Sequence, residues 1–351
     1  MIRYSEAYWN DVDRVLACVP HLEELKGASI LITGATGMIC SSLAELLLCC
    51  NRSQGAGIRI ILAGRSLDRI HSRFSGFMEG EDYFYLPYDA TGQGSLDIDA
   101  EYIVHGASNA DPAVLTEEPV ETILANVTGL NRLLKAAGAG KSKRLLYISS
   151  SEVYGNRPAR SEEVPYREED YGYVDILNPR AAYPAAKRTA ETLCVSYGKE
   201  YGIDTVIVRP GHIYGPSITD KDSRASAQFT RNAAAGENIV MKSAGTQLRS
   251  YCYTLDCASA ILTVLLNGDR GNAYNISNRD SIVTIRDVAE AFAAAGGTKV
   301  VFEEASSREK AGYNLMTNSS LNAEKLENLG WRALFGLEEG AKKTIAFYRQ
   351  G

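Results

Sequence analysis

Thr33-Gly34-Ala35-Thr36-Gly37-Met38-Ile39-Cys40 follows the short apolar run Ser29-Ile30-Leu31-Ile32 and precedes a longer stretch rich in apolar residues. A strand, a glycine loop and a helix in this order are typical of a turn that binds a dinucleotide pyrophosphate, because backbone N–H groups at the helix N-terminus point at the anion. Gly34 permits the tight turn, and Gly37 lets the backbone approach the phosphates. Cys40 occupies the place of a third glycine and is small enough for close helix–strand packing. Two glycines alone are also common in ordinary strand–helix turns.

Five further apolar runs follow the first, and stretches with helical spacing separate most of them. The runs are short and nearly continuous, which is typical of strands buried on both faces of a parallel sheet. We expect strands over residues 29–33, 58–63, 83–86, 102–105, 144–149 and 204–209, and helices over 38–50, 120–137 and 183–201. This alternation predicts an α/β fold with a Rossmann-type, doubly wound parallel sheet covered by helices on both faces.

The regular alternation extends from residue 28 to residue 210. Before it, residues 1–27 carry apolar side chains mostly three or four positions apart and predict a helical N-terminal extension that Pro20 interrupts. We therefore predict a dinucleotide-binding domain over 28–210, followed over 211–351 by a mainly substrate-binding, smaller lobe with some segments that return to the first domain. Within that lobe, residues 216–236 are polar, a strand is expected over 237–241, and a helix is expected over 253–266.

Bulk composition excludes several classes of protein. The net charge of −6 argues against nucleic acid as a partner, since binding phosphates needs a basic face. No apolar run approaches the roughly 20 residues of a membrane-spanning helix, and residues 1–11 lack the apolar segment of a secretory signal. The seven cysteines include no C-x-x-C pair and the four histidines are scattered. We therefore expect no metal site, and reduced thiols in a cytoplasmic protein.

The end of the second expected strand bears on the choice of cofactor. It has the sequence Leu62-Ala63-Gly64-Arg65-Ser66, without the carboxylate that would bind the ribose hydroxyls of NAD. Arg65 suits a 2′-phosphate or stacking on adenine, although a solvated arginine at a strand end is also common. We expect NAD, with NADP as the alternative that Arg65 favours. Two later strand ends supply further contacts, with Asp89 and Ala90 near the adenine and Gly106, Ala107 and Ser108 along the cofactor.

Tyr183 and Lys187 are four residues apart and share one face of an expected helix. A phenol has a reference pKa near 10, and a nearby ammonium together with a positively charged nicotinamide ring lowers it. Tyr183 would then accept a hydroxyl proton while hydride leaves the same carbon. The Y-x-x-x-K spacing also arises by chance in a chain with 20 tyrosines. Support comes from the end of the fifth expected strand, where the Ser150 hydroxyl is placed to hold the reacting oxygen, with Ser151 and Glu152 beside it.

Four features occur together and in order: the loop at Gly34; Ser150 within S-S-S-E-V-Y-G; Tyr183 and Lys187 within Y-P-A-A-K-R; and R-P-G-H-I-Y-G-P over residues 209–216. Over about residues 28–345 the chain resembles the extended short-chain dehydrogenases/reductases, and more narrowly the NAD-dependent epimerase/dehydratase family of nucleotide-sugar enzymes. The resemblance implies a nucleotide-diphosphate sugar as substrate, oxidation of its carbon 4 to a ketone, and a homodimer. It also implies that the cofactor is contacted by Thr36, Gly37, Met38, Ile39, Asn126, Tyr183, Lys187 and Pro210.

The groups beside the tyrosine distinguish the reactions of that family. A 4,6-dehydratase carries an Asp–Glu pair where this chain has Ser151-Glu152, and a 4-epimerase usually lacks the glutamate. UDP-glucuronate decarboxylases carry T-S-E-V-Y-G, close to S-S-S-E-V-Y-G, and a tyrosine segment similar to Pro179-Arg180-Ala181-Ala182-Tyr183. The chain therefore resembles these decarboxylases most, and a 4-epimerase, a 4,6-dehydratase and a keto-sugar reductase stay as alternatives.

Four residues are candidates for binding the sugar acid and the diphosphate: Arg180, His212, Arg224 and Arg249. Guanidinium groups suit both anions, and Arg224 and Arg249 match arginines of the enzymes that the chain resembles. A surface role is the alternative for each of these two arginines. His212 stands where the decarboxylases usually have asparagine. A dinucleotide-binding redox sensor without turnover is the non-enzyme alternative, and the presence of Tyr183 and Lys187 argues against it.

Overall fold

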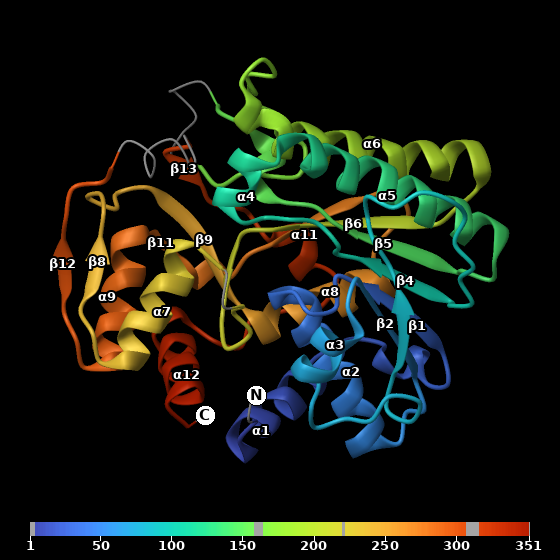
Figure 1. Ribbon diagram of the computed structural model, residues 1–351, viewed down its shortest axis with the longest axis horizontal. Coiled ribbons are helices and arrows are strands. Elements are labelled where there is room, and N and C mark those ends of the chain that lie inside the picture. Colours follow the sequence, from blue (N-terminus) through green and yellow to red (C-terminus); the bar gives the residue numbers. More distant parts are fainter. Residues whose placement is uncertain (1–3, 158–163, 220–221, 307–315, 351) are drawn as a thin grey trace.

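A parallel sheet of seven strands, in the order β3-β2-β1-β4-β5-β6-β10, forms the centre of the computed structural model, which describes residues 4–157, 164–219, 222–306 and 316–350 (Figure 1). All neighbouring strands of this sheet pair in parallel. The strands are β1 (Ser29–Thr33), β2 (Arg59–Gly64), β3 (Phe84–Pro87), β4 (Tyr102–His105), β5 (Arg144–Ile148), β6 (Thr205–Pro210) and β10 (Ala273–Ile276). The predicted Rossmann-type sheet is confirmed, and its first six strands begin and end within one residue of the predicted ranges.

Alternate residues of each central strand face opposite sides of the sheet. On β1, Ile30 and Ile32 belong to one apolar cluster, and Leu31 between them belongs to the other. The first cluster includes side chains of α1 (Glu6–Leu16), α2 (Met38–Gln54) and α8 (Thr254–Asn267), and the second those of α5 (Pro119–Ala139) and α6 (Ala182–Tyr201), on the opposite face (Figure 1). Because both faces are covered, the strands are apolar throughout instead of alternating with polar residues. Two short helices, α3 (Leu67–Arg73) and α4 (Pro112–Glu117), follow β2 and β4.

Segments outside residues 28–210 contribute to the central domain. Helix α1 packs against α2 and α8 and buries Tyr8, Val12, Val15 and Leu16. Strand β10 extends the sheet beyond β6, and α8 covers one of its faces. We propose to keep the division at residues 27/28 and 210/211 as a description of the chain, with α8 and β10 as the segments that return to the first domain.

The remaining elements form a smaller lobe at one end of the sheet (Figure 1). One small sheet has the order β11-β9-β13, with β7 also paired to β9, and a second consists of β12 and β8. Helices α7, α9 and α12 pack against one another beside them. The bounds are β7 (His212–Tyr214), α7 (Ala225–Ala235), β8 (Ile239–Met241), β9 (Leu248–Tyr253), β11 (Ile282–Thr284), α9 (Ile285–Gly296), β12 (Val300–Phe302), β13 (Asn318–Ser319) and α12 (Leu337–Gln350). The short helix α11 (Glu324–Glu327) packs against β10 of the central sheet instead.

The sequence prediction named only a strand over residues 237–241 and a helix over 253–266 in this lobe, so most of its other elements, such as β7, α9 and α12, were not predicted. Residues 216–236, expected to be a polar stretch, contain α7, which buries Ala227, Phe229 and Ala233. The helix expected from residue 253 begins at Thr254, directly after β9, a strand that the sequence analysis did not predict. Strand β9 is buried although it carries Arg249 and Ser250, because strands from distant parts of the chain pair with it.

Within the residues that the structure describes, no helix is both long and apolar enough to cross a membrane. The same residues hold no group of three or more His, Cys, Asp or Glu side chains arranged to bind a metal ion. All seven cysteines are free, and six of them are buried.

Candidate active site

Three glycines at the carboxyl ends of β1 and β4, Gly34, Gly37 and Gly106, form what we call the glycine cradle. Gly34 has a φ of +69°, and a Cβ atom there would lie 2.9 Å from backbone atoms of Gly106 and Ala107. Gly37 is the N-cap of α2, where a Cβ would lie 3.2 Å from the Gly34 carbonyl oxygen. A Cβ on Gly106 would overlap the sulfur of Cys40, the residue at the third-glycine position. Because glycine has no side chain, these three residues leave the N-terminus of α2 accessible, as a bound pyrophosphate requires.

A cavity of about 370 Å³ adjoins the glycine cradle. It is bounded by the loops after β1, β2, β3 and β4 and by the start of α5. Its lining includes most of the predicted cofactor residues: Gly34, Thr36, Gly37, Arg65, Asp89, Ala90, Gly106, Ala107 and Ser108. It also includes residues that the sequence analysis did not identify: Gly64, Ser66, Arg69, Ile70, Tyr88, Thr91, Asn109, Glu118, Glu121, Thr122, Ala125 and Thr219.

The other predicted cofactor residues do not line this cavity: Met38, Ile39, Asn126, Tyr183, Lys187 and Pro210. Asn126 is buried on α5, where its amide nitrogen donates to the Ser108 hydroxyl (3.0 Å) and its amide oxygen accepts from the Tyr147 hydroxyl (3.0 Å). Asn126 therefore acts on the cavity by holding Ser108 in place. Asp89 does line the cavity, and one of its carboxylate oxygens already accepts from the backbone and the hydroxyl of Thr91.

The side chains predicted for catalysis meet at the carboxyl end of β5. Ser150 lies two residues beyond the end of this strand, and its hydroxyl bonds to the Tyr183 phenol. Lys187, one turn further along α6, donates to the Ile148 carbonyl oxygen (2.8 Å), and its ammonium nitrogen lies 5.7 Å from the centre of the Tyr183 ring. Together with Glu152 and Arg180, these residues form what we call the Tyr183 cluster. Ser151 is buried beside it, at the start of the short helix η2 (Ser151–Tyr154).

The pKa of the Tyr183 phenol lies above its ordinary value. Burial and then the Glu152 carboxylate raise this pKa, the Ser150 hydrogen bond and the charges of Arg180 and Arg224 lower it, and the net value is about 12. Burial also lowers the pKa of Lys187 to about 7, so its ammonium is only partly charged at neutral pH. Without a bound nicotinamide, burial and Glu152 therefore outweigh the charges that lower the phenol pKa. The predicted lowering by Lys187 together with a nicotinamide ring stays a prediction.

Glu152 and Arg180 form a two-pronged ion pair next to Tyr183. The Arg180 guanidinium donates to both carboxylate oxygens at 3.0 and 2.9 Å, and both side chains are about four-fifths buried. Arg180 lies in the one-turn helix η4 (Pro179–Ala181) that leads into α6, so the same short segment positions Arg180 and Tyr183. Arg180 Nε is buried, has no hydrogen-bond partner among the residues described, and can donate to a further group.

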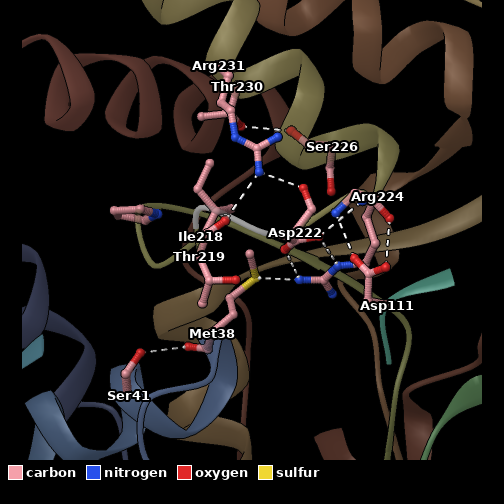
Figure 2. A network of polar contacts seen from close by, with 12 residues as sticks. Met38, Ser41, Asp111, Ile218, Thr219, Asp222, Arg224, Ser226, Thr230 and Arg231 are labelled. Atoms are coloured by element: carbon pink, nitrogen blue, oxygen red, sulfur yellow. Dashed lines mark hydrogen bonds and ion pairs between the residues drawn. The ribbon is translucent and has the colours of Figure 1, made fainter. Parts of the chain in front are cut away.

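Arg224, predicted to bind substrate, lies between the central domain and the smaller lobe (Figure 2). Its guanidinium donates to both oxygens of Asp222, at 2.9 and 2.5 Å, and approaches the Met38 sulfur at 3.6 Å. The neighbouring Ser223 donates through its backbone and its hydroxyl to Asp111, in the loop after β4. Because Arg224 also acts on the phenol pKa, the loop before α7 comes within electrostatic reach of Tyr183.

His212 and Arg249 lie on the paired strands β7 and β9. Arg249 is buried and donates to the carbonyl oxygens of Leu248, Met316 and Thr317, and burial lowers its pKa. Among the described residues no carboxylate pairs with it. Burial, together with the charges of Arg249 and Arg224, lowers the pKa of His212 to about 3, so the ring is neutral. Its Nδ1 atom is buried and has no hydrogen-bond partner within the part of the chain that the structure describes.

Comparison with known proteins identifies the family. The sequence model of the NAD dependent epimerase/dehydratase family matches residues 30–277. The chain belongs to this family. This epimerase/dehydratase-family protein is 30% identical to UDP-glucuronic acid decarboxylase 1 of Xenopus tropicalis over 338 residues, which are 95% of this chain and 75% of that protein. It is 32% identical to UDP-glucuronic acid decarboxylase 6 of Arabidopsis thaliana over 250 residues, which are 71% of this chain and 69% of that protein.

Solved structures share the fold of this epimerase/dehydratase-family protein. UDP-glucose 4-epimerase of Thermus thermophilus, in complex with NAD, has a TM-score of 0.74 at 24% identity and covers 92% of this chain and 99% of its own. dTDP-glucose 4,6-dehydratase of Bacillus anthracis, in complex with NAD, has a TM-score of 0.73 at 20% identity and covers 92% and 97%. At these identities the likeness establishes the fold alone. The family is NAD-dependent, and the glycine cradle and its cavity fit such a dinucleotide.

Some of the cavity residues that were not predicted do carry a signal in the sequence, and there are two such signals. Glu118, Glu121, Thr122 and Ala125 follow the i, i+3, i+4, i+7 spacing of one helix face, so the start of α5 presents this face to the cavity. Arg69 follows Arg65 by four residues. Thr219 gave no signal, because it reaches the cavity from the smaller lobe.

Proposed function

We propose that this chain is a UDP-glucuronate-type decarboxylase that works through a 4-keto sugar. The observation that carries the proposal is the Glu152–Arg180 ion pair beside the hydrogen-bonded Ser150 and Tyr183. A dehydratase would need a second carboxylate at residue 151, where this chain has a buried serine. The two decarboxylase relatives, matched over most of the chain, support the same choice.

Tyr183 performs the first step by taking the proton of the sugar 4-hydroxyl. Bound NAD supplies the hydride acceptor for the same carbon and, by its positive charge, favours the phenolate. Ser150 donates to the phenol oxygen and so holds it at the reacting hydroxyl. Burial of Tyr183 and Lys187 excludes water from the proton transfer.

The second step is the loss of the sugar carboxylate. A ketone at carbon 4 makes the carboxylate on carbon 5 a β-keto acid, which loses carbon dioxide readily. The unpartnered Nε of Arg180 is available to orient this carboxylate, and Glu152 is placed to relay the proton that returns to carbon 5. Reversal of the first step, with Tyr183 as the acid, then returns the ketone to an alcohol.

The substrate carries several negative charges, and the arginines of the lobe suit them. Arg249 is buried without a carboxylate partner among the described residues, and burying an unpaired charge is costly. A substrate diphosphate would compensate that charge. Among the described residues, one guanidinium nitrogen of Arg224 has no hydrogen bond after its pairing with Asp222, and His212 offers its neutral ring beside the two arginines.

Product analysis tests the proposal. The purified protein is incubated with UDP-glucuronate, and we expect carbon dioxide and a UDP-pentose. If the product is UDP-galacturonate, the protein is a 4-epimerase. Net oxidation or reduction of an added NAD(P) would indicate a keto-sugar reductase. UDP-glucose and dTDP-glucose, tested in parallel, would yield a 4-keto-6-deoxy sugar from a dehydratase. If none of these substrates reacts, the result favours the alternative that the chain is a dinucleotide-binding redox sensor without turnover.

We also propose a homodimer formed through the outer faces of α5 and α6. Val120, Ile123, Leu124 and Val195 are between 42% and 60% exposed on these two adjacent helices, which is a large apolar area for a free surface. The double variant Ile123→Glu, Leu124→Glu should be a monomer by light scattering, and an unchanged mass would contradict this interface.

The seven free cysteines support our prediction of a reducing, cytoplasmic compartment.

A further inference from the structure

The adenosine end of the cavity carries positive charge where an NAD-binding site carries a carboxylate. Arg65 follows β2 directly, Ser66 caps α3, and Arg69 lies one turn further, and all three side chains line the cavity that contains the glycine cradle. Strand β2 is the neighbour of β1, so these residues lie next to the loop of Gly34. This is the position at which an acidic residue would bind the ribose 2′-hydroxyl of NAD.

The Arg65 and Arg69 side chains are available for a ligand. Both residues are exposed, and neither guanidinium forms a hydrogen bond or an ion pair with a described residue. Other arginines of the chain are occupied in this way; for example, Arg52 pairs with Asp82 and Arg59 with Asp99. An anion placed between Arg65 and Arg69 would therefore gain charged hydrogen bonds without breaking existing ones.

The acidic side chains that line the same cavity lie on other strand ends. Asp89 follows β3, one strand beyond β2, and one of its oxygens already accepts twice from Thr91. Glu118 and Glu121 lie at the start of α5, on the connection from β4 to β5, on the other side of β1. None of them occupies the end of β2. Asp89 nevertheless lies within electrostatic reach of Arg65, whose charge adds to the Thr91 hydrogen bonds in lowering the pKa of the Asp89 carboxyl.

We propose that Arg65, Ser66 and Arg69 form a subsite for the 2′-phosphate of NADP, and that this chain binds NADP at least as tightly as NAD. The inference rests on the cofactor cleft of the proposed function but not on the sugar or the reaction. A guanidinium binds phosphate through two parallel N–H groups, and Ser66 adds a hydroxyl. The chain would thus differ in cofactor preference from the NAD dependence for which its family is described.

Calorimetric titration of the whole protein with NADP⁺ and with NAD⁺, in the absence of sugar, tests this inference. We expect a dissociation constant for NADP⁺ equal to or below that for NAD⁺. The variant Arg65→Gln should weaken NADP⁺ binding about tenfold to a hundredfold, as loss of a charged hydrogen bond does, and change NAD⁺ binding less than about threefold. Arg65→Lys, which keeps the charge and loses the planar fork, should fall between the two.

Arg59→Gln is the matched control, because Arg59 is an exposed arginine at the opposite end of the same strand. It should leave both dissociation constants unchanged. Tighter binding of NAD⁺ than of NADP⁺ by the parent would overturn the proposal, and so would an equal loss of both affinities in Arg65→Gln. If neither dinucleotide binds, the proposed function fails as well. If NADP⁺ binds as expected but UDP-glucuronate is not converted, the proposed function alone fails.

Discussion

The glycine cradle and the Tyr183 cluster lie at the same edge of one sheet, but different physical effects determine them. The cradle depends on atoms that are absent, since a single Cβ on Gly34 or Gly106 would collide with a backbone or a sulfur. The Tyr183 cluster depends on charges whose pKa values burial has shifted. Substitutions that add volume to the glycine cradle should therefore lower stability and weaken cofactor binding. Substitutions that remove a functional group from the Tyr183 cluster should instead lower turnover.

The largest expected effect is on turnover, in the Tyr183 cluster. Tyr183→Phe removes the hydroxyl that accepts the substrate proton and should lower kcat about a thousandfold or more, because positioned acid–base groups contribute about this much. Cofactor binding should change little, since Tyr183 does not line the cavity. Turnover of UDP-glucuronate and a cofactor titration measure the two. Tyr201→Phe, at the exposed end of the same helix, is the control. Full activity of Tyr183→Phe would refute the proposed mechanism.

The next effect is on stability, in the glycine cradle. Gly34→Ala places a Cβ at positive φ and 2.9 Å from backbone atoms of Gly106 and Ala107, so it should lower the free energy of unfolding by about 2–4 kcal/mol and weaken cofactor binding. Gly55→Ala is a matched control, because Gly55 also has positive φ (+60°) but nothing lies within 4 Å of its Cβ position. It should cost about 1 kcal/mol. Equal losses in the two variants, by urea unfolding, would show that backbone strain and not collision governs Gly34.

The contrast also explains what the sequence could predict. The central strands were predictable because each is buried on both faces and therefore apolar throughout, as in Ser29–Thr33. Strand β9 was not, because Arg249 and Ser250 are buried there by hydrogen bonds to Met316, Ser277 and other distant residues. Local periodicity carries no trace of such partners.

The site divides in the same way. Gly34, Ser150, Tyr183 and Lys187 could be named from their spacing, since each lies at the end of a predicted strand or on a predicted helix. The pairing of Glu152 with Arg180 across 28 residues, and the raised pKa of the phenol, depend on burial that only the folded chain creates.

A smaller effect couples Gly106 to Cys40. Gly106→Ala should lower the free energy of unfolding by about 1–3 kcal/mol, because its Cβ would overlap the Cys40 sulfur. Removing that sulfur in Cys40→Ala should recover part of the loss, so that the double variant is more stable than the sum of the single effects by about 1 kcal/mol. Strictly additive losses in a double-mutant cycle would show that Cys40 and Gly106 are not packed as described.

The last effect is a slope of the unfolding free energy with pH, small at each pH step, and it tests the electrostatic side of the comparison. Burial lowers the pKa of Lys187 to about 7, whereas the unfolded chain keeps a value near 10.5. Between these values the unfolded state binds the proton more strongly, so the stability of the parent should rise with pH relative to Lys187→Met, by at most about 1.4 kcal/mol per pH unit. Unfolding free energies at pH 7 to 10 measure the difference, and Lys199→Met, on the exposed end of α6, controls for the loss of a lysine. A flat or falling difference would mean that Lys187 stays charged in the fold, and that its ammonium, after all, acts on the Tyr183 phenol without a bound cofactor.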